Sequence, residues 1–129
     1  MTAEREVLPW PERHDAAGKT HLSMAVRGGD FLFVSGLIAL DPASGEPMRG
    51  TTAGETRAIL TQLAQLLEAA GSSLDRVVKV NVLLASMLEA PNMNDVYARF
   101  FPDPPPARTV CGARLPDGVK VMIECTALA

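Results

Sequence analysis

The first clear pattern along this chain is a stripe of apolar residues at helical spacing. Apolar side chains recur three to four positions apart from Ile59 to Ala70, so they form one face of a helix. The preceding residues Thr52-Ala53-Gly54-Glu55 have the pattern of a capping box, in which the hydroxyl and the carboxylate satisfy free amides. Gly71 stands where a left-handed C-terminal cap belongs. The pattern predicts a helix that packs on a sheet.

A second helix is predicted to begin near Pro91, because proline is accepted in the first helical turn. Its apolar positions are again spaced by three and four, and they are expected to be core residues: Met93, Val96, Tyr97, Phe100 and Phe101. The proline-rich segment Pro102 to Pro106 must end this helix, since consecutive prolines cannot continue one.

Apolar and β-branched runs predict the strands. In the N-terminal part, residues 21–26 and 31–34 flank a turn and read as a hairpin, with Ser35-Gly36 ending the second strand and a possible short strand over residues 37–40. The strongest run is Val77 to Leu84, which is nearly continuous in apolar character, as a central strand would be.

Two further strands are predicted near the C-terminus. They span residues 108–115 and 119–128, and Pro116-Asp117-Gly118 between them has turn composition, so the two are expected to form a hairpin. The order ββ(β)αβαββ favours an α+β fold, a mixed β-sheet with two helices packed on one face. The uncovered, apolar face of such a sheet is expected to pack against another copy of the chain. We expect one domain over residues 1–129, with an irregular leader over residues 1–20.

Composition excludes several classes of function. The 129 residues are 47% hydrophobic and 21% charged, which is typical of a globular domain. A net charge of −3 with scattered basic residues gives no footprint for nucleic acid. No window approaches the apolar length of a membrane span, and the polar, acidic start is unlike a secretion signal, so we expect a cytoplasmic protein.

The cysteines and histidines give no sign of a disulfide or a metal site. The hairpin register would place Cys111 near Ile123 rather than Cys125, so we expect both cysteines to be reduced and buried. His14 and His21 lie seven residues apart without a ligand cluster nearby, so no metal is expected.

Arg108 is the strongest candidate for chemistry. The proline segment before it is stiff and a β-like run follows it, so the guanidinium is expected to have little freedom to lose on binding. Its planar fork can donate two parallel hydrogen bonds to a carboxylate. The residues leave open two simpler roles for Arg108, a solvated residue at a strand edge or half of a structural ion pair.

Seven short motifs occur in the order and spacing of one family, over residues 20 to the end. They are Phe33-Val34-Ser35-Gly36, Ala69-Ala70-Gly71-Ser72-Ser73-Leu74, Val77-Val78-Lys79-Val80, Asn94-Asp95-Val96-Tyr97, Pro106-Ala107-Arg108-Thr109, Leu115-Pro116 and Ile123-Glu124-Cys125. In these motifs the chain resembles the RidA/YjgF family of reactive enamine/imine deaminases. The resemblance implies a chorismate-mutase-like fold, a homotrimer whose sheets form a central barrel, ligand clefts between subunits, and neither a metal nor an organic cofactor.

The resemblance also implies roles for four residues. Arg108 matches the arginine that holds the substrate carboxylate, Ser35 and Gly36 match the cleft wall, and Asn94 matches an asparagine of the second helix. Ser35-Gly36 could equally end a strand, and Asn94 could brace the start of a helix.

The sequence departs from the family pattern at three positions. Leu22 replaces a tyrosine, Val110 a cysteine, and Met122 the glutamate proposed to handle water. Glu124 corresponds to a second family acid and is a weaker catalytic candidate, because it lies two residues further along the same strand face, about 6.5 Å away. A structural role for Glu124 at a subunit interface is the alternative.

The function implied by the resemblance is hydrolysis of 2-imino acids, such as 2-aminoacrylate, to 2-keto acids and ammonia, with an apolar pocket around Leu22 and Met122. Two alternatives remain open: a non-catalytic trimer that binds small carboxylic acids or a protein partner, and a deaminase specific for a bulkier unsaturated amino acid. Some family members are described as ribonucleases, but the acidic balance and the absence of a basic stripe argue against that activity here.

Overall fold

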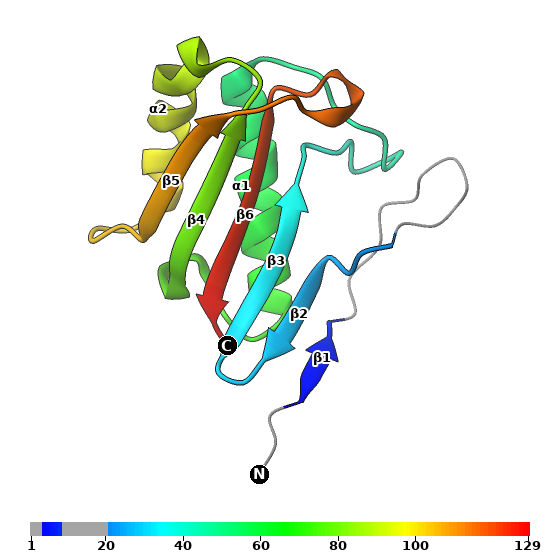
Figure 1. Ribbon diagram of the computed structural model, residues 1–129, viewed down its shortest axis with the longest axis vertical. Helices are drawn as coiled ribbons and strands as arrows, with labels where there is room; N and C mark the ends of the chain where they lie inside the picture. The colour runs from blue at the N-terminus through cyan, green and yellow to red at the C-terminus, as the bar shows by residue number, and fades with distance from the viewer. Residues whose placement is uncertain (1–3, 9–20) are drawn as a thin grey trace.

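The computed structural model describes residues 4–8 and 21–129. Within these residues, six strands form one sheet, and two α-helices lie on one of its faces (Figure 1). The strands are β1 (Arg5–Val7), β2 (Ala25–Gly28), β3 (Phe31–Leu37), β4 (Val77–Leu84), β5 (Ala107–Gly112) and β6 (Val121–Leu128). The helices are α1 (Thr52–Ala69) and α2 (Ala90–Phe100). The predicted α+β fold, with a mixed sheet and both helices on one face, is confirmed.

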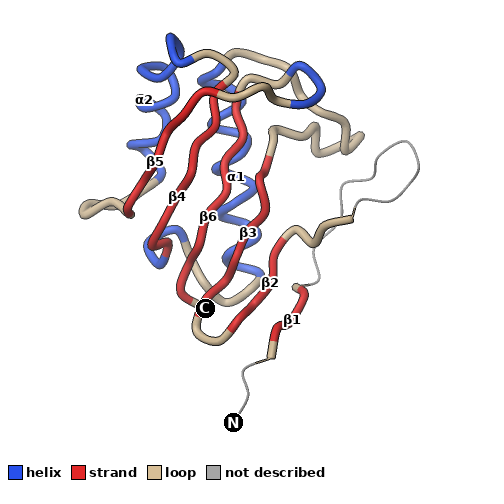
Figure 2. Tube along the Cα trace, in the orientation of Figure 1, coloured by secondary structure: helices blue, strands red, loops and turns tan. Residues whose placement is uncertain are grey.

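The strand order across the sheet is β1-β2-β3-β6-β4-β5 (Figure 2). Neighbouring strands are antiparallel except β4 and β5, which are parallel and are connected through α2. The leader over residues 1–20 was predicted to be irregular, and this was wrong for residues 5–7, because β1 pairs with β2. Residues 9–20 lie outside the described part of the chain.

The prediction that the last two strands form a hairpin was wrong. β6 lies between β3 and β4, whereas β5 pairs with the other side of β4, so β4 separates the two strands. Their connection crosses the end of β4 and is attached there by two backbone hydrogen bonds, Ala113 N–H to the Leu84 carbonyl (2.9 Å) and Ala85 N–H to the Lys120 carbonyl (3.0 Å). The chain does turn at residues 116–118, but the composition of a turn does not specify which strands pair.

The start of α1 is capped by Thr51 rather than by the predicted Thr52. The Thr51 hydroxyl accepts a hydrogen bond from the Gly54 amide at 3.0 Å. Glu55 is fully buried, and its carboxylate accepts hydrogen bonds from the backbone amides of Gly50 (3.1 Å) and Lys120 (2.8 Å). A buried carboxylate therefore joins the first turn of α1 to the crossing connection. At the other end of the helix, Gly71 has φ +84°, which confirms the predicted left-handed cap.

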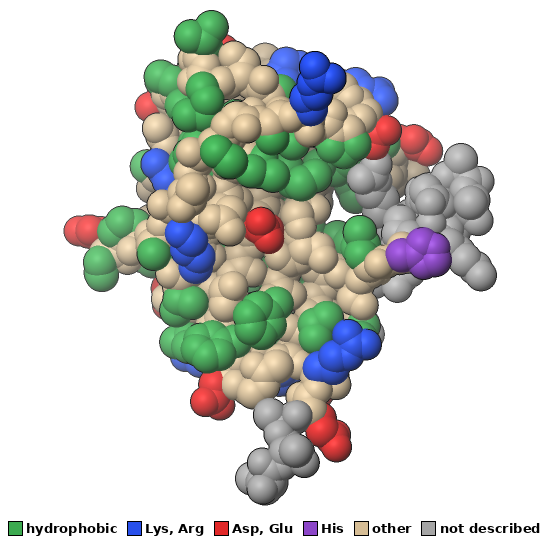
Figure 3. All heavy atoms as spheres, viewed as in Figure 1, with side chains coloured by type: hydrophobic (Ala, Val, Ile, Leu, Met, Phe, Trp, Pro, Cys, Tyr) green, Lys and Arg blue, Asp and Glu red, His purple; other side chains and the backbone are tan. Residues whose placement is uncertain are grey.

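The core lies between the helices and one face of the sheet. Alternate residues of β3 and β6 face it, including Leu32, Val34, Ile123 and Cys125. The opposite face of the sheet has no helix over it, and hydrophobic side chains gather on that side of the molecule (Figure 3). The exposed aromatic residues of β3, Phe31 and Phe33, are 40% and 49% exposed.

Both cysteines are free thiols, as predicted, but their surroundings differ. Cys125 is buried, and this burial raises the pKa of its thiol to about 12, so the thiol is protonated at neutral pH. Cys111 is exposed, which corrects the prediction that both are buried. The error follows from the hairpin assumption, because Cys111 lies beside Leu83 on a strand at the edge of the sheet.

β3 does not end at Ser35-Gly36. The strand continues to Leu37, and its register with β6 shifts between Val34 and Leu37, which marks a β-bulge. The bulge places the residues that were assigned to a cleft wall beside the middle of β6. Residues 37–40 add no further strand beyond an isolated bridge between Leu40 and Pro47.

Candidate functional site

Arg108 is held against α2 by two side chains of that helix. Its Nη1 donates a hydrogen bond to Asn94 Oδ1 at 2.7 Å. Its guanidinium carbon lies 4.7 Å from the centre of the Tyr97 ring, within the range of a cation–π interaction. Asn94 and Tyr97 are three residues apart, so both project from the same face of α2. Within the described part of the chain, Arg108 forms no ion pair with a carboxylate.

Tyr97, whose ring lies under the Arg108 guanidinium, is a neutral hydrogen-bond donor. The residue is 6% exposed, and burial raises the pKa of its phenol to about 12, although the charge of Arg108 opposes the shift. Among the described residues, its hydroxyl has no hydrogen-bond partner. The ring also packs on Phe101, with 4.5 Å between the ring centres. Tyr97 was predicted as a core residue, and it is one, but it also supports the arginine.

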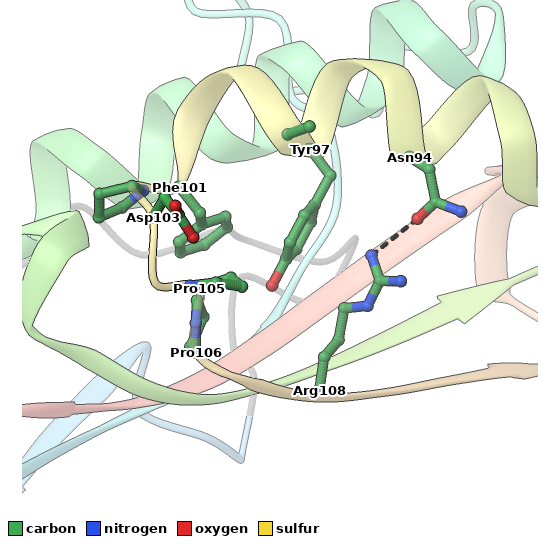
Figure 4. A pocket seen from close by; sticks show the side chains of 9 residues that line it. Asn94, Tyr97, Phe101, Asp103, Pro105, Pro106 and Arg108 are labelled. Carbon is green, nitrogen blue, oxygen red and sulfur yellow. Dashed lines mark hydrogen bonds between the residues drawn. The ribbon is translucent and has the colours of Figure 1, made fainter.

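A pocket of about 410 Å³ lies beside the guanidinium. The side chains around it come from α2, the proline segment and β5 (Figure 4). We call this the arginine pocket, and its lining residues are Asn94, Tyr97, Ala98, Phe101, Pro102, Asp103, Pro105, Pro106 and Arg108. Asn94 and Arg108 therefore meet at one pocket, with the guanidinium at its edge.

A second group of the predicted site residues surrounds the bulge of β3. We call Leu22, Ser35, Gly36 and Met122 the bulge cluster. The Ser35 hydroxyl donates a hydrogen bond to the Ser23 backbone carbonyl at 2.6 Å, so in this conformation it cannot donate to a ligand. Leu22 is 52% exposed and lines, together with Gly36, a small cavity of about 60 Å³.

Gly36 is needed for the position of Met122. A Cβ atom at Gly36 would lie 2.6 Å from the Met122 sulfur and 3.0 Å from its Cγ, so the thioether occupies the space of the missing side chain. This contact places an apolar group where the family resemblance expects a glutamate. The bulge cluster therefore has no carboxylate of its own.

Gly36→Ala is expected to destabilise the protein by about 1 to 2 kcal/mol, because the added methyl group forces the Met122 side chain out of its site. Met122→Ala should remove the conflict, so the double variant should lose less than the sum of the two single variants. Urea denaturation of the four proteins measures this coupling. Strict additivity would contradict the contact.

The two remaining predicted residues lie apart from both groups. Val110 lies two residues after Arg108 on the same face of β5, but it packs against the core and does not line the arginine pocket. Glu124 is an exposed residue of β6, opposite Asn81 of β4. In the described residues it forms no ion pair, and it is not part of the bulge cluster's small cavity.

Within one chain, the arginine pocket and the bulge cluster do not meet. Ser35 and Gly36 on β3 are three strand spacings, about 14 Å, from β5, and Met122 on β6 is two spacings, about 10 Å, from it. The two groups also use different faces of the sheet. Arg108 points to the helix side, beside Val80, whereas Met122 and Glu124 alternate with core residues and point to the uncovered side.

Across residues 4–8 and 21–129, no group of three or more histidine, cysteine or acidic residues is placed to hold a metal ion. His14, one of the two histidines considered from the sequence, lies outside these described residues. None of the described helices has the length and apolar character to cross a membrane.

Sequence reasoning identified Arg108 and Asn94 but missed the rest of the arginine pocket. Tyr97 and Phe101 have the same three-and-four spacing as the core residues of α2, so periodicity alone could not assign them a second role. Their position along the chain was the one sequence feature that could have indicated a role in the pocket. Both aromatic residues lie at the C-terminal end of the helix, shortly before the proline segment that leads to Arg108, and that segment forms the facing wall of the pocket.

Comparison with known proteins places the chain in a family. The family model described as "Endoribonuclease L-PSP" matches residues 13–129. A RutC family protein of Pyrococcus horikoshii is 42% identical over 106 residues, which cover 81% of this chain and 84% of that protein. A 2-iminobutanoate/2-iminopropanoate deaminase of Bos taurus is 39% identical over 107 residues, covering 82% and 78% of the two chains.

The fold is also that of a solved Rid family structure. The crystal structure of YyfA from Yersinia pestis superposes with a TM-score of 0.87 at 26% identity, covering 98% of this chain and all of that one. The structural match and the sequence matches thus indicate the same family. This protein belongs to the endoribonuclease L-PSP family, which is also called the RidA/YjgF family.

Proposed function

We propose that the protein hydrolyses 2-imino acids to 2-keto acids and ammonia, with the substrate carboxylate bound by Arg108. One observation carries the proposal: a guanidinium held by Asn94 and Tyr97 faces a pocket and has no carboxylate partner among the described residues. An arginine that is already positioned loses little entropy when it binds an anion. The deaminase of Bos taurus, a relative with 39% identity, supports the same reaction class.

The reaction needs no redox chemistry. The oxygen of a water molecule adds to the C=N carbon, and the nitrogen receives a proton, which gives a carbinolamine. The hydroxyl proton of the carbinolamine then passes to the nitrogen, the C–N bond breaks so that ammonia leaves, and the C–O bond becomes the C=O bond of the keto acid. Binding of the carboxylate by Arg108 orients the carbon for attack, which is the largest contribution this chain offers to the reaction.

We further propose that each reaction site forms between subunits of a homotrimer. Arg108 and Asn94 come from one protomer, and the bulge cluster with Glu124 comes from its neighbour. In one chain β5 is separated by about 10 Å from β6 and by about 14 Å from β3, and the groups lie on different faces of the sheet, which supports this arrangement. The exposed Phe31 and Phe33 give the uncovered sheet face an apolar surface suited to association.

Light scattering is expected to give three times the chain mass of 13.7 kDa. Phe33→Glu should reduce that mass, because it places a charge on the uncovered sheet face. Leu88→Glu is the matched control: Leu88 is 89% exposed and lies outside the sheet, so this variant should stay trimeric. A monomeric wild-type protein would contradict the proposed assembly.

A coupled assay tests the activity. An amino-acid lyase generates 2-aminoacrylate in the presence of the protein, and the decay of the imine is followed. The wild-type protein should accelerate that decay, and Arg108→Ala should accelerate it far less at the same substrate concentration. Equal decay with both proteins would contradict the proposal. The cytoplasmic location expected from the sequence stays a prediction.

A specific observation favours a second candidate, a non-catalytic protein that binds small carboxylic acids. Met122 fills the space beside Gly36, so the bulge cluster presents a thioether where a water-handling acid is expected. Under this alternative the protein would bind 2-oxobutyrate through Arg108 without turning over any imine. Turnover therefore distinguishes the two candidates, whereas binding does not.

A further inference from the structure

We infer that the arginine pocket is the subsite for the substrate's side chain and that the protein prefers 2-imino acids with a large apolar or aromatic side chain. This inference rests on the proposed function, since it extends the role of the same arginine. It assigns a role to Tyr97, Ala98, Phe101 and the proline segment, residues to which the carboxylate-binding function gives none.

The size of the pocket argues for a large side chain. Its volume of about 410 Å³ lies in the range of pockets that hold small organic ligands, about 300 to 1,000 Å³. The imine of alanine has six non-hydrogen atoms, whereas the imine of phenylalanine has twelve. The larger imine covers more of the apolar walls and leaves less of the pocket to water.

The walls of the pocket suit an apolar group. Tyr97 and Phe101 present a ring pair whose centres are 4.5 Å apart, and prolines of residues 102–106 form the opposite side. The accessible parts of these rings offer apolar and aromatic contact to a ligand side chain. The prolines are stiff, so the wall loses little conformational freedom when a ligand binds.

The two charged residues of the pocket define which end of the ligand lies where. Arg108 donates to Asn94 through Nη1, so its Nε and Nη2 remain to receive the carboxylate. Asp103, an exposed residue of the proline segment, also lines the pocket. A second carboxylate on the substrate would therefore meet a like charge. The pocket therefore favours aromatic and branched side chains and disfavours acidic ones.

A substrate series tests the preference. An L-amino-acid oxidase generates the imines of alanine, leucine, phenylalanine and glutamate, and hydrolysis of each is measured with the wild-type protein. We expect kcat/KM for the phenylalanine and leucine imines to exceed that for the alanine imine about tenfold, as differences of a few methylenes do in an apolar pocket. Equal values, or a preference for the alanine imine, would overturn the inference and leave the proposed function standing.

A blocking variant tests the location. Ala98 is an exposed helical residue that lines the pocket, so Ala98→Phe should fill the subsite without disturbing the core. We expect kcat/KM for the phenylalanine imine to fall more than tenfold, and to fall at least about fivefold more than kcat/KM for the alanine imine. Ala69→Phe is the matched control, because Ala69 is exposed at the end of α1 and lies outside the pocket.

Two other outcomes have a definite meaning. If Ala98→Phe lowers both activities equally, or dissociates the assembly in light scattering, the pocket does not select side chains and the inference is wrong. If the wild-type protein hydrolyses no imine, the proposed function fails, and binding of phenylpyruvate compared with pyruvate then tests the subsite. Calorimetry should show tighter binding of phenylpyruvate in the wild-type protein and not in Ala98→Phe, and equal binding would overturn the inference.

Discussion

Replacing Arg108 with alanine is expected to lower kcat/KM for imine hydrolysis about 100-fold. Two charge-assisted hydrogen bonds to the carboxylate are lost, and at about 1.5 kcal/mol each they sum to about 3 kcal/mol. A tenfold change in rate corresponds to about 1.4 kcal/mol, so the loss is about two orders of magnitude. Most of it should be a higher KM, because the carboxylate is bound in both the ground state and the transition state.

Two further variants show whether the fork geometry matters or merely the charge. Arg108→Lys keeps the positive charge but cannot form the bidentate pair, so it should recover part of the lost activity and remain about tenfold below wild type. Arg99→Ala removes an exposed arginine from the last turn of α2 that does not line the pocket, and its kcat/KM should stay within twofold of wild type. Wild-type kcat/KM in Arg108→Ala would remove the basis of the proposed function.

Glu55→Ala is expected to lower the free energy of unfolding by about 3 kcal/mol or more. The carboxylate is fully buried and accepts hydrogen bonds from the Gly50 and Lys120 amides. Loss of each of these hydrogen bonds to a charged, buried carboxylate costs about 1.5 to 3 kcal/mol, and the shortened side chain also leaves a cavity. Urea denaturation at one fixed protein concentration measures the loss, since stability of an oligomer depends on concentration.

The matched control for this prediction is Glu68→Ala. Glu68 is an exposed residue near the C-terminus of the same helix, where a negative charge is unfavourable to the helix dipole, so its removal should be neutral or slightly stabilising. Glu55→Gln keeps one carbonyl acceptor and should fall between the two alanine variants. A loss in Glu55→Ala no larger than in Glu68→Ala would show that the buried contacts contribute nothing.

The helices and the central strand could be predicted because they depend on local patterns. The apolar stripe of α1, the left-handed Gly71 and the bounds of β4 all follow from residues close together in sequence. The choice between Thr51 and Thr52 as the cap could not be made in this way. Both are threonines, and the backbone conformation, which is extended at Thr51, decides which hydroxyl reaches the free amide.

The pairing of the last strand was beyond the sequence, because strand pairing is a long-range property. The turn at residues 116–118 shows that the chain reverses there, but β6 gains more buried apolar surface between β3 and β4 than it would beside β5 at the sheet edge. The residues of the arginine pocket also fall into a part that local sequence predicts and a part that depends on long-range packing. The stiffness of the proline segment indicated Arg108 from nearby residues, whereas the aromatic floor under it depends on how α2 lies across β5.

The placement of the arginine pocket and the bulge cluster on opposite faces of one sheet affects how such a protein can diverge. Arg108 is positioned by α2, whereas Met122 is positioned by the glycine of the β3 bulge, so the two depend on different neighbours. Substitutions in the bulge cluster can therefore accumulate without disturbing the side chains that hold the arginine. Descendants of one ancestral gene can inherit an unchanged arginine and acquire new reactivity from the other face, which makes this fold well suited to functional diversification after gene duplication.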